Sequence, residues 1–206
     1  MRFSRFLSSA IGWTIRVALV LVLSVSLSSQ DTEGEIERVA NDGWLAARAL
    51  APIGAPRDRL GPVNRSLERL DTLIVNVSAR YADAAIRAAI SAAQEEREEM
   101  KVFLEHARAL SVQMALTGAP ARWPLPIDEL EGELWFEVDR FSESRDAYQR
   151  ATKTTASPRA WLGLARASAR LDDIAAACAA YKAISTADAS ELEKTEIAVY
   201  LLRCRN

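Results

Sequence analysis

The sequence has few of the side chains that most often carry chemistry. It contains one histidine, His106, and two cysteines, Cys178 and Cys204. A zinc site needs several histidine or cysteine ligands, and a carboxylate site in a helix bundle uses a Glu-x-x-His pair, whereas Phe103 stands three residues before His106. Glycine-rich phosphate loops, Gly-x-Ser-x-Gly elbows and Cys-x-x-Cys pairs are also absent. The sequence therefore predicts no catalytic site, no metal and no cofactor.

An excess of positive charge is missing as well. The chain has 26 basic and 28 acidic side chains. Three of the arginines lie in residues 1–28, which contain no acid, so the remainder has 23 basic against 28 acidic side chains and a net charge of −5. A nucleic-acid-binding protein would need a basic patch, and an anionic membrane surface would repel this balance. The composition argues against both partners.

Residues 1–28 have the pattern of a secretory signal. Three arginines precede an uncharged, mostly apolar run of 11 residues from Val17 to Leu27, and Ser26 and Ser28 have the spacing of a cleavage site. This run is shorter than the ~20 residues that span a bilayer. We therefore expect cleavage after Ser28 and delivery to the periplasm or outside the cell. The alternative is an uncleaved inner-membrane anchor through residues 11–27.

The remaining sequence is typical of an all-α protein. It is rich in alanine and has few β-branched runs. Residues 29–117 are predicted to form a helical N-terminal region, with a Pro- and Gly-containing loop at residues 51–62. Residues 63–117 contain neither glycine nor proline, and one helix of that length would be ~80 Å long. We expect a break near Asn76–Arg80, with Ser78 as the cap of the next helix; a strand over Leu73–Val77 is the less favoured alternative.

Residues 118–127 are predicted to be a Pro-rich linker. They contain Gly118 and three prolines around Trp123. Trp123 is expected to cover the end of a neighbouring helix pair. The linker marks the start of a C-terminal region over residues 128–206.

That C-terminal region contains an internal repeat of 33 residues. The equivalent positions are Gly132, Phe141, Ser144 and Tyr148 in the first unit, and Ala165, Ile174, Ala177 and Tyr181 in the second. Small residues at equivalent positions let two antiparallel helices approach closely. Asp139, Asp172 and Asp173 are candidate helix N-caps at the turns within the units, and Pro158 can start the second unit.

The repeat resembles the tetratricopeptide repeat family. The matching motifs are Trp161-x-x-Leu164-Ala165, Ala177-x-x-x-Tyr181, Gly132-x-x-Trp135 and Ser144-x-x-x-Tyr148. The first unit departs from the family at Asp128 and Glu131, where large apolar residues are usual. The resemblance implies two helical hairpins over residues 128–184 in a short right-handed α-solenoid. A polar-faced capping helix over Ser190–Arg203 would close it, with buried positions among Leu192, Thr195, Ile197, Val199, Leu201 and Leu202.

The resemblance also implies a binding surface, because the first helix of each repeat lines the concave face in this family. It places seven residues there: Glu129, Glu133, Phe136, Glu137, Leu162, Arg166 and Arg170. The face would be acidic at one end and basic at the other, with apolar anchors at Phe136 and Leu162, and would hold a peptide or a protein helix. The alternative is that Glu133 or Glu137 pairs with Arg166 or Arg170 across adjacent helices.

These features predict an exported, non-enzymatic protein–protein interaction module or scaffold of the cell envelope. One alternative is a structural protein that oligomerises through a coiled-coil face of its N-terminal helices. Another is a helical ligand carrier or enzyme whose site the sequence does not reveal. Export would permit a disulfide between Cys178 and Cys204, although two buried free thiols would also fit their surroundings.

Overall fold

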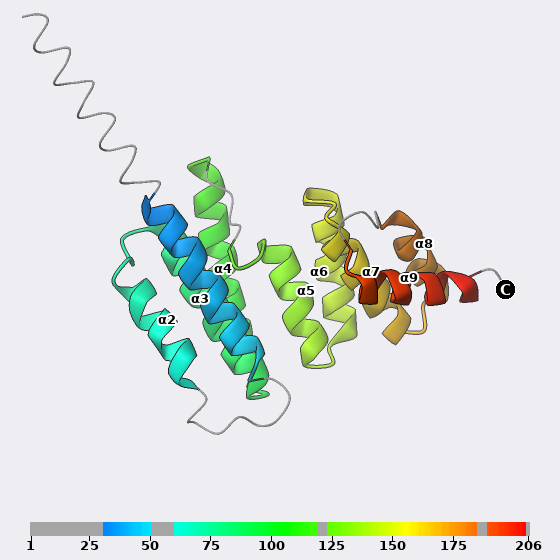
Figure 1. Cartoon of the computed structure of the whole chain (residues 1–206), viewed down its shortest axis with the longest axis horizontal. Coiled ribbons are helices and arrows are strands. Elements are labelled where there is room, and N and C mark those ends of the chain that lie inside the picture. Colours follow the sequence, from blue (N-terminus) through cyan, green and yellow to red (C-terminus); the bar gives the residue numbers. More distant parts are fainter. Residues whose placement is uncertain (1–30, 51–59, 119–122, 185–188, 205–206) are drawn as a thin grey trace, which may run out of the picture.

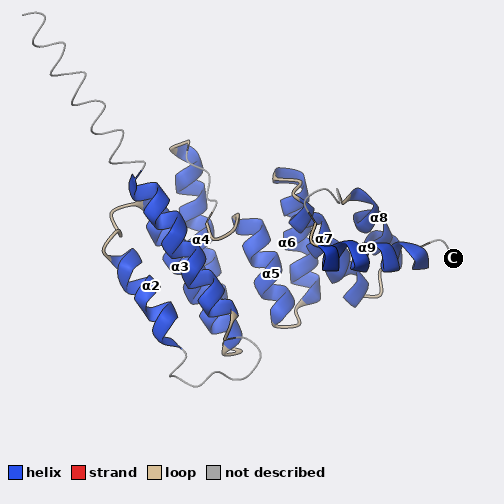
Figure 2. Cartoon of the chain, in the orientation of Figure 1, coloured by secondary structure: helices blue, strands red, loops and turns tan. Residues whose placement is uncertain are grey.

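The computed structural model describes residues 31–50, 60–118, 123–184 and 189–204, and every regular element in these ranges is a helix (Figure 2). The prediction of an all-α protein is thereby confirmed for the described part of the chain. The predicted signal and anchor lie outside it. No helix in the described ranges is both long and apolar enough to cross a membrane.

The N-terminal half is a bundle of four helices. Residues 31–48 form the first, followed by α2 (Gly61–Asp71), α3 (Val77–Ala93) and α4 (Arg97–Leu116), which lie side by side in Figure 1. Gly43 sets the close approach of the first helix to α2 and α3. A Cβ atom there would lie 2.6 Å from Ile86 Cδ1 and 2.9 Å from Ser66 Cβ. Tyr81 and Met100 are fully buried in the core of this bundle.

The predicted break between α2 and α3 exists, but its details differ. Residues 72–76 form a turn, which excludes the strand alternative, and Asn76 caps α3 by accepting a hydrogen bond of 2.8 Å from the Ser78 amide. The N-cap of α3 is therefore Asn76 and not Ser78, as the sequence had suggested. A second break, which sequence reasoning did not locate, separates α3 from α4 at Gln94–Glu96. There Glu95 adopts a left-handed backbone conformation with φ of 61°.

The Pro-rich linker joins the bundle to α5 (Ile127–Glu137) without interrupting the core. The Tyr81 hydroxyl donates a hydrogen bond of 2.6 Å to the carbonyl of Leu125, and Trp123 packs against the bundle core. Leu130 and Leu134 on α5 belong to the same hydrophobic cluster. The first helix of the predicted repeat is therefore also a wall of the N-terminal bundle.

Four further helices follow, and each packs against the next: α6 (Phe141–Thr154), α7 (Pro158–Arg170), α8 (Ile174–Ala183) and α9 (Glu191–Arg203). They extend the molecule away from the bundle, and α9 runs along its long axis whereas α5 and α6 run across it (Figure 1). Ser157 and Asp173 cap α7 and α8 by accepting hydrogen bonds of 3.0 Å from main-chain amides.

Two of the three predicted aspartate caps are wrong. Asp139 and Asp172 have φ of 59° and 57°, and each occupies the left-handed position that ends the helix before it. Aspartate tolerates this conformation better than most residues. The prediction for α9 is also partly wrong. Ile197 is buried as expected, but Leu192, Val199 and Leu202 are 80%, 50% and 61% exposed, so the outer face of this helix is not polar.

Candidate functional site

A cleft of about 390 Å³ lies between α5 and α7. Five of the seven residues predicted for the concave face line it: Glu133, Phe136, Glu137, Leu162 and Arg166. Three of them come from α5 and two from α7, the first helices of the two predicted repeat units. Residues three or four positions apart share one face of a helix, so each set lies on one face of its helix. The geometry therefore brings most of the predicted surface together.

The other two predicted residues lie outside the cleft. Glu129 is only 4% exposed, and it accepts hydrogen bonds from Thr155 Oγ1 at 3.1 Å and Ser157 Oγ at 2.7 Å. These hydrogen bonds link the connection between α6 and α7 to α5. Arg170 covers the Phe141 ring at 4.3 Å and pairs with Asp139 at 3.7 Å. Both side chains are committed to contacts within the fold.

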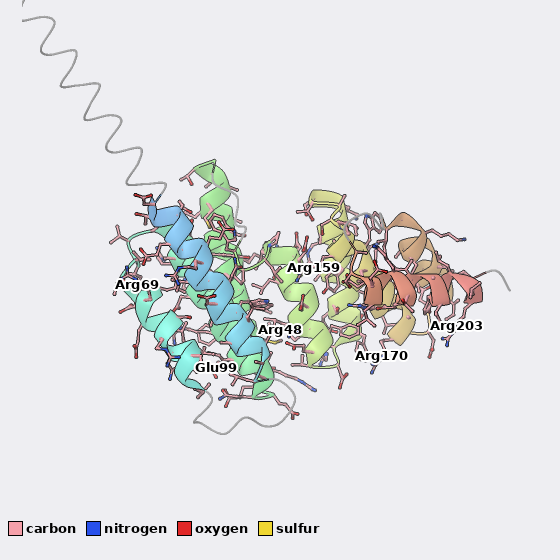
Figure 3. The ribbon with its side chains drawn as sticks, in the orientation of Figure 1. Arg48, Arg69, Glu99, Arg159, Arg170 and Arg203 are labelled. Atoms are coloured by element: carbon pink, nitrogen blue, oxygen red, sulfur yellow. A yellow bond between two sulfur atoms is a disulfide. The ribbon has the colours of Figure 1, made fainter. Side chains whose placement is uncertain are left out.

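The acidic wall of the cleft is partly neutralised by Arg48, which sequence reasoning did not single out. Arg48 comes from the helix over residues 31–48 and points toward α5 (Figure 3). Its Nη2 atom lies 3.1 Å from Glu133 Oε1, and its Nη1 atom contacts Glu137. Burial lowers the pKa of Arg48 and the charge of Glu133 raises it, but arginine stays protonated throughout the ordinary pH range.

The basic wall is neutralised in the same way by α9. Arg166 donates two hydrogen bonds, of 2.9 and 2.6 Å, to the two carboxylate oxygens of Glu196. The Tyr181 hydroxyl donates a third, of 2.8 Å, to the same carboxylate. The hydrogen bonds from Arg166, supported by Tyr181, hold the pKa of Glu196 below its ordinary value despite partial burial. In the described structure Arg166 therefore pairs with α9 and not with an acidic residue of α5, contrary to the alternative considered from the sequence.

Tyr148 of α6 is clamped at the base of the cleft by two glycines. A Cβ atom on Gly132 would lie 2.7 Å from its Cδ2 atom, and one on Gly163 would come closer still to the other end of the ring. The side chain is 5% exposed and lines the cleft. Among the described residues, none hydrogen-bonds its hydroxyl. Because burial raises the pKa of Tyr148, this hydroxyl stays protonated and can donate.

A second ionic cluster lies on another side of α5 and involves Asp128 and Glu131. Glu131 accepts from Arg108 Nε at 2.7 Å and from Arg150 Nη2 at 2.5 Å, and Asp128 accepts from the same two arginines at 2.8 and 3.0 Å. The hydrogen bond to Glu131 raises the pKa of Arg108. The cluster ties α4, α5 and α6 together, so the two acidic residues have a structural role.

The wall formed by α9 is also held covalently. Cys178 of α8 and Cys204 at the end of α9 form a disulfide, with their Cα atoms 5.8 Å apart. This is the pairing considered from the sequence. The bond fixes the C-terminal end of α9, while Glu193 and Glu196 near its other end face the cleft and Arg166.

No metal site accompanies the cleft in the described part of the chain. His106 is exposed on α4, and no group of three or more His, Cys, Asp or Glu side chains among the described residues could hold a metal ion. Comparisons with protein-family models, with curated proteins and with solved structures find no match. The geometry of the cleft is therefore the basis on which a function can be proposed.

Proposed function

We propose that the protein is a non-enzymatic interaction module or scaffold, similar to tetratricopeptide repeat proteins and exported to the cell envelope. Its cleft would hold a short segment of a partner protein. Export is supported by the signal-like pattern of residues 1–28. The cleft volume of about 390 Å³ suits one or two side chains of a bound segment, since small-ligand pockets begin at roughly 300 Å³.

The observation that carries this proposal is the hydroxyl of Tyr148, which has no hydrogen-bond partner among the described residues. The hydroxyl oxygen is not among the buried side-chain atoms that lack a partner in the described residues, so it is accessible from the cleft and can donate to a ligand there. Tyr181, which stands 33 residues later, donates its hydroxyl to a carboxylate on the next helix. We infer that Tyr148 donates in the same manner to an acceptor of the bound segment, while Phe136 and Leu162 contact its apolar side chains.

The charges on the walls support the choice of a peptide over a strongly charged ligand. The charged side chains that line the cleft are three arginines and three glutamates, so neither a polyanion nor a polycation meets an excess of opposite charge. Arg159 is the least constrained cation in the cleft. Among the described residues it pairs with Glu133 alone, at 3.5 Å. It is the side chain most free to approach one carboxylate or carbonyl of the ligand.

Selection from a random peptide library against the purified protein tests the proposal. Peptides that occupy the cleft should lose affinity about fivefold on Tyr148→Phe, because one hydrogen bond is worth about 1 kcal/mol. Leu162→Ala should weaken them further. Tyr200→Phe is the matched control, since this ring stacks on Tyr181 outside the cleft. If no peptide is selected, or if the selected peptides bind both cleft variants as tightly as the unchanged protein, the cleft is not the binding site.

A structural role is the second candidate, and one observation favours it. Val102, Val112 and Leu116 on α4 are exposed, and with the exposed Ala109 they follow a heptad-like spacing of seven, three and four residues. Oligomerisation through α4 would depend on these side chains. Val112→Glu would then abolish the oligomer.

A further inference from the structure

A second hollow, of about 330 Å³, adjoins the cleft where α7 faces α9. It shares Arg159, Leu162 and Glu193 with the cleft, and we call it the side pocket. Its apolar lining residues are Pro158, Leu162, Ile184, Ala189 and Ile197. Its volume suits one side chain or a small ligand, since small-ligand pockets begin at roughly 300 Å³.

Glu129 of α5 lines the side pocket with a carboxylate that forms no ion pair among the described residues. The side chain is 4% exposed, and its hydrogen bonds from Thr155 and Ser157 both end on Oε1. Oε2 accepts no hydrogen bond from the described residues, yet it is not one of their fully buried unpartnered atoms, so it keeps access to the pocket. Glutamate is rarely buried to this extent without an ionic partner.

The surroundings compensate the charge of Glu129 only in part. Its two hydroxyl donors are neutral, and the first turn of α5, on which it lies, contributes a partial positive charge. The N-termini of α7 and α9 are already capped by serine side chains. Arg159 lies 3.5 Å from Glu133 and forms no ion pair with Glu129. Together with Glu193, the described lining of the side pocket has two negative charges and one positive charge.

We propose that the side pocket binds a primary ammonium group on an aliphatic stem, which is the chemistry of a lysine side chain or of a small alkylamine. The ammonium would pair with Oε2 of Glu129, and the stem would lie along Leu162, Ile184 and Ile197. A lysine side chain has this construction, because its four-carbon stem packs on apolar surface and its head is a compact charge.

The hydrogen bonds of Glu129 favour an ammonium over a guanidinium. A guanidinium pairs best with a carboxylate through two parallel hydrogen bonds, one to each oxygen. Oε1 already accepts from two hydroxyls, so only Oε2 is free. An ammonium is a point charge and can pair with one oxygen.

The inference rests on the proposed function of the cleft only for the source of the amine. A protein segment in the cleft could place a lysine in the side pocket, because the two hollows share lining residues. A free alkylamine would need the side pocket alone. The two sources therefore require separate measurements.

Titration of the purified protein with butylammonium, followed by NMR at constant ionic strength, tests the side pocket by itself. We expect a dissociation constant of roughly 1–10 mM for so small a ligand. Glu129→Gln keeps an acceptor for the two hydroxyls but removes the charge, so it should weaken binding at least tenfold. Glu191→Gln is the matched control, since this exposed glutamate of α9 lies outside the pocket, and it should leave binding unchanged.

A ligand series on the unchanged protein tests the same pairing without any variant. Butanol has the stem but no charge and should bind at least tenfold more weakly than butylammonium. Butylguanidinium should bind about fivefold more weakly, because its second hydrogen bond finds no free oxygen. Equal binding of butylammonium and butanol, or equal binding to the unchanged protein and a folded Glu129→Gln variant, would overturn the proposal. Equal binding of butylguanidinium would overturn the preference for an ammonium.

Peptides selected against the cleft identify the source. If they contain a lysine and lose affinity at least tenfold on Glu129→Gln, a partner protein supplies the amine. If they bind without regard to Glu129 while butylammonium requires it, the source is a free alkylamine. If no peptide is selected and butylammonium still requires Glu129, the function proposed for the cleft fails and the side pocket stands. If cleft peptides are selected and butylammonium does not bind, the reverse holds.

Discussion

Replacing Gly132 by alanine tests whether Tyr148 is clamped as described. In an ordinary helix this change is favourable by about 0.5–1 kcal/mol, because glycine loses more backbone entropy on folding. Here the new methyl would lie 2.7–2.8 Å from three atoms of the Tyr148 ring, about 0.7 Å inside ordinary contact distance. Gly163 also lies against this ring, because a Cβ atom there would overlap three of its atoms, so the ring has little room to move. Overpacking of this kind costs ~1–3 kcal/mol, so we expect a net destabilisation of about 1–2 kcal/mol.

Urea unfolding followed by circular dichroism measures this difference. With a slope of about 2 kcal/mol per M, the midpoint should fall by roughly 0.5–1 M without a change in slope. Gly34→Ala is the matched control, since no atom lies within 4 Å of a Cβ built there, and its midpoint should stay or rise. In a Tyr148→Ala background, Gly132→Ala should become neutral or favourable, with a coupling energy of at least ~1 kcal/mol. Equal midpoint shifts for Gly132→Ala and Gly34→Ala would refute the clamp.

Three other perturbations test the remaining contacts around the cleft. Arg48→Ala should destabilise the fold by ~1–3 kcal/mol because it leaves two glutamates of α5 without their shared partner; Arg38→Ala, which removes an exposed pair, should cost less than ~1 kcal/mol in the same urea titration. The lowered pKa of Glu196 means that its contribution is present above its ordinary pKa of 4.5 and is lost as the pH falls through the folded-state value. Glu196→Gln should therefore lower stability at pH 7 and should reduce the further loss of stability below about pH 4.5. Melting temperatures measured over a series of pH values test this. If those of the variant and of the unchanged protein fell equally on the acid side, the role of this carboxylate would be contradicted. Reducing the disulfide should lower the free energy of unfolding by ~3 kcal/mol, because it links two residues that are 26 positions apart in the chain. Cys178→Ser should reproduce the effect and be insensitive to reductant, and a melting temperature that does not change on reduction would count against the bond.

The helical periodicity predicted the fold class well but not the partners of individual charges. The resemblance to tetratricopeptide repeats predicts that Phe136 and Leu162 share one surface, because each lies on the first helix of a predicted repeat unit. Arg48, by contrast, reaches that surface from a helix 85 positions before Glu133 in the chain. No periodic pattern links two residues so far apart. Opposite charges at such separations become partners only through the packing of the intervening helices.

The missed break at Glu95 has a different cause. The residues around it are glutamates and an arginine, which favour helix, so local propensity gives no signal for a turn. The turn follows instead from the packing of α3 against α4, whose apolar stripes can be buried only if the chain reverses.

On α9 the sequence contains more apolar residues than one buried face requires. The row that contains Leu192, Val199 and Leu202 lies half a turn from Ile197, and periodicity alone does not determine which of the two sides faces the core. In the structure Ile197 is buried and the row faces solvent. That choice depends on the orientation of α9 against α7 and α8, which the contacts of Glu196 and the disulfide help to fix.

The position of α5 gives Asp128 and Glu131 a structural role. Its hairpin partner is α6. Here α5 also packs on the N-terminal bundle, through Leu130 and Leu134 in the shared core and through Arg108 at the two acidic positions. Large apolar residues at Asp128 and Glu131 would leave that guanidinium, and that of Arg150, without these carboxylates.

The same contacts decide how the cleft can act on a partner. One of its walls is joined to the bundle through Arg48, and the other is joined to α9 through Arg166 and Glu196. A segment that entered the cleft would therefore meet walls that are already positioned, and little of its binding free energy would be spent on ordering them. Breaking either ionic contact would free one wall, so its first effect on binding should be a faster dissociation of the bound segment.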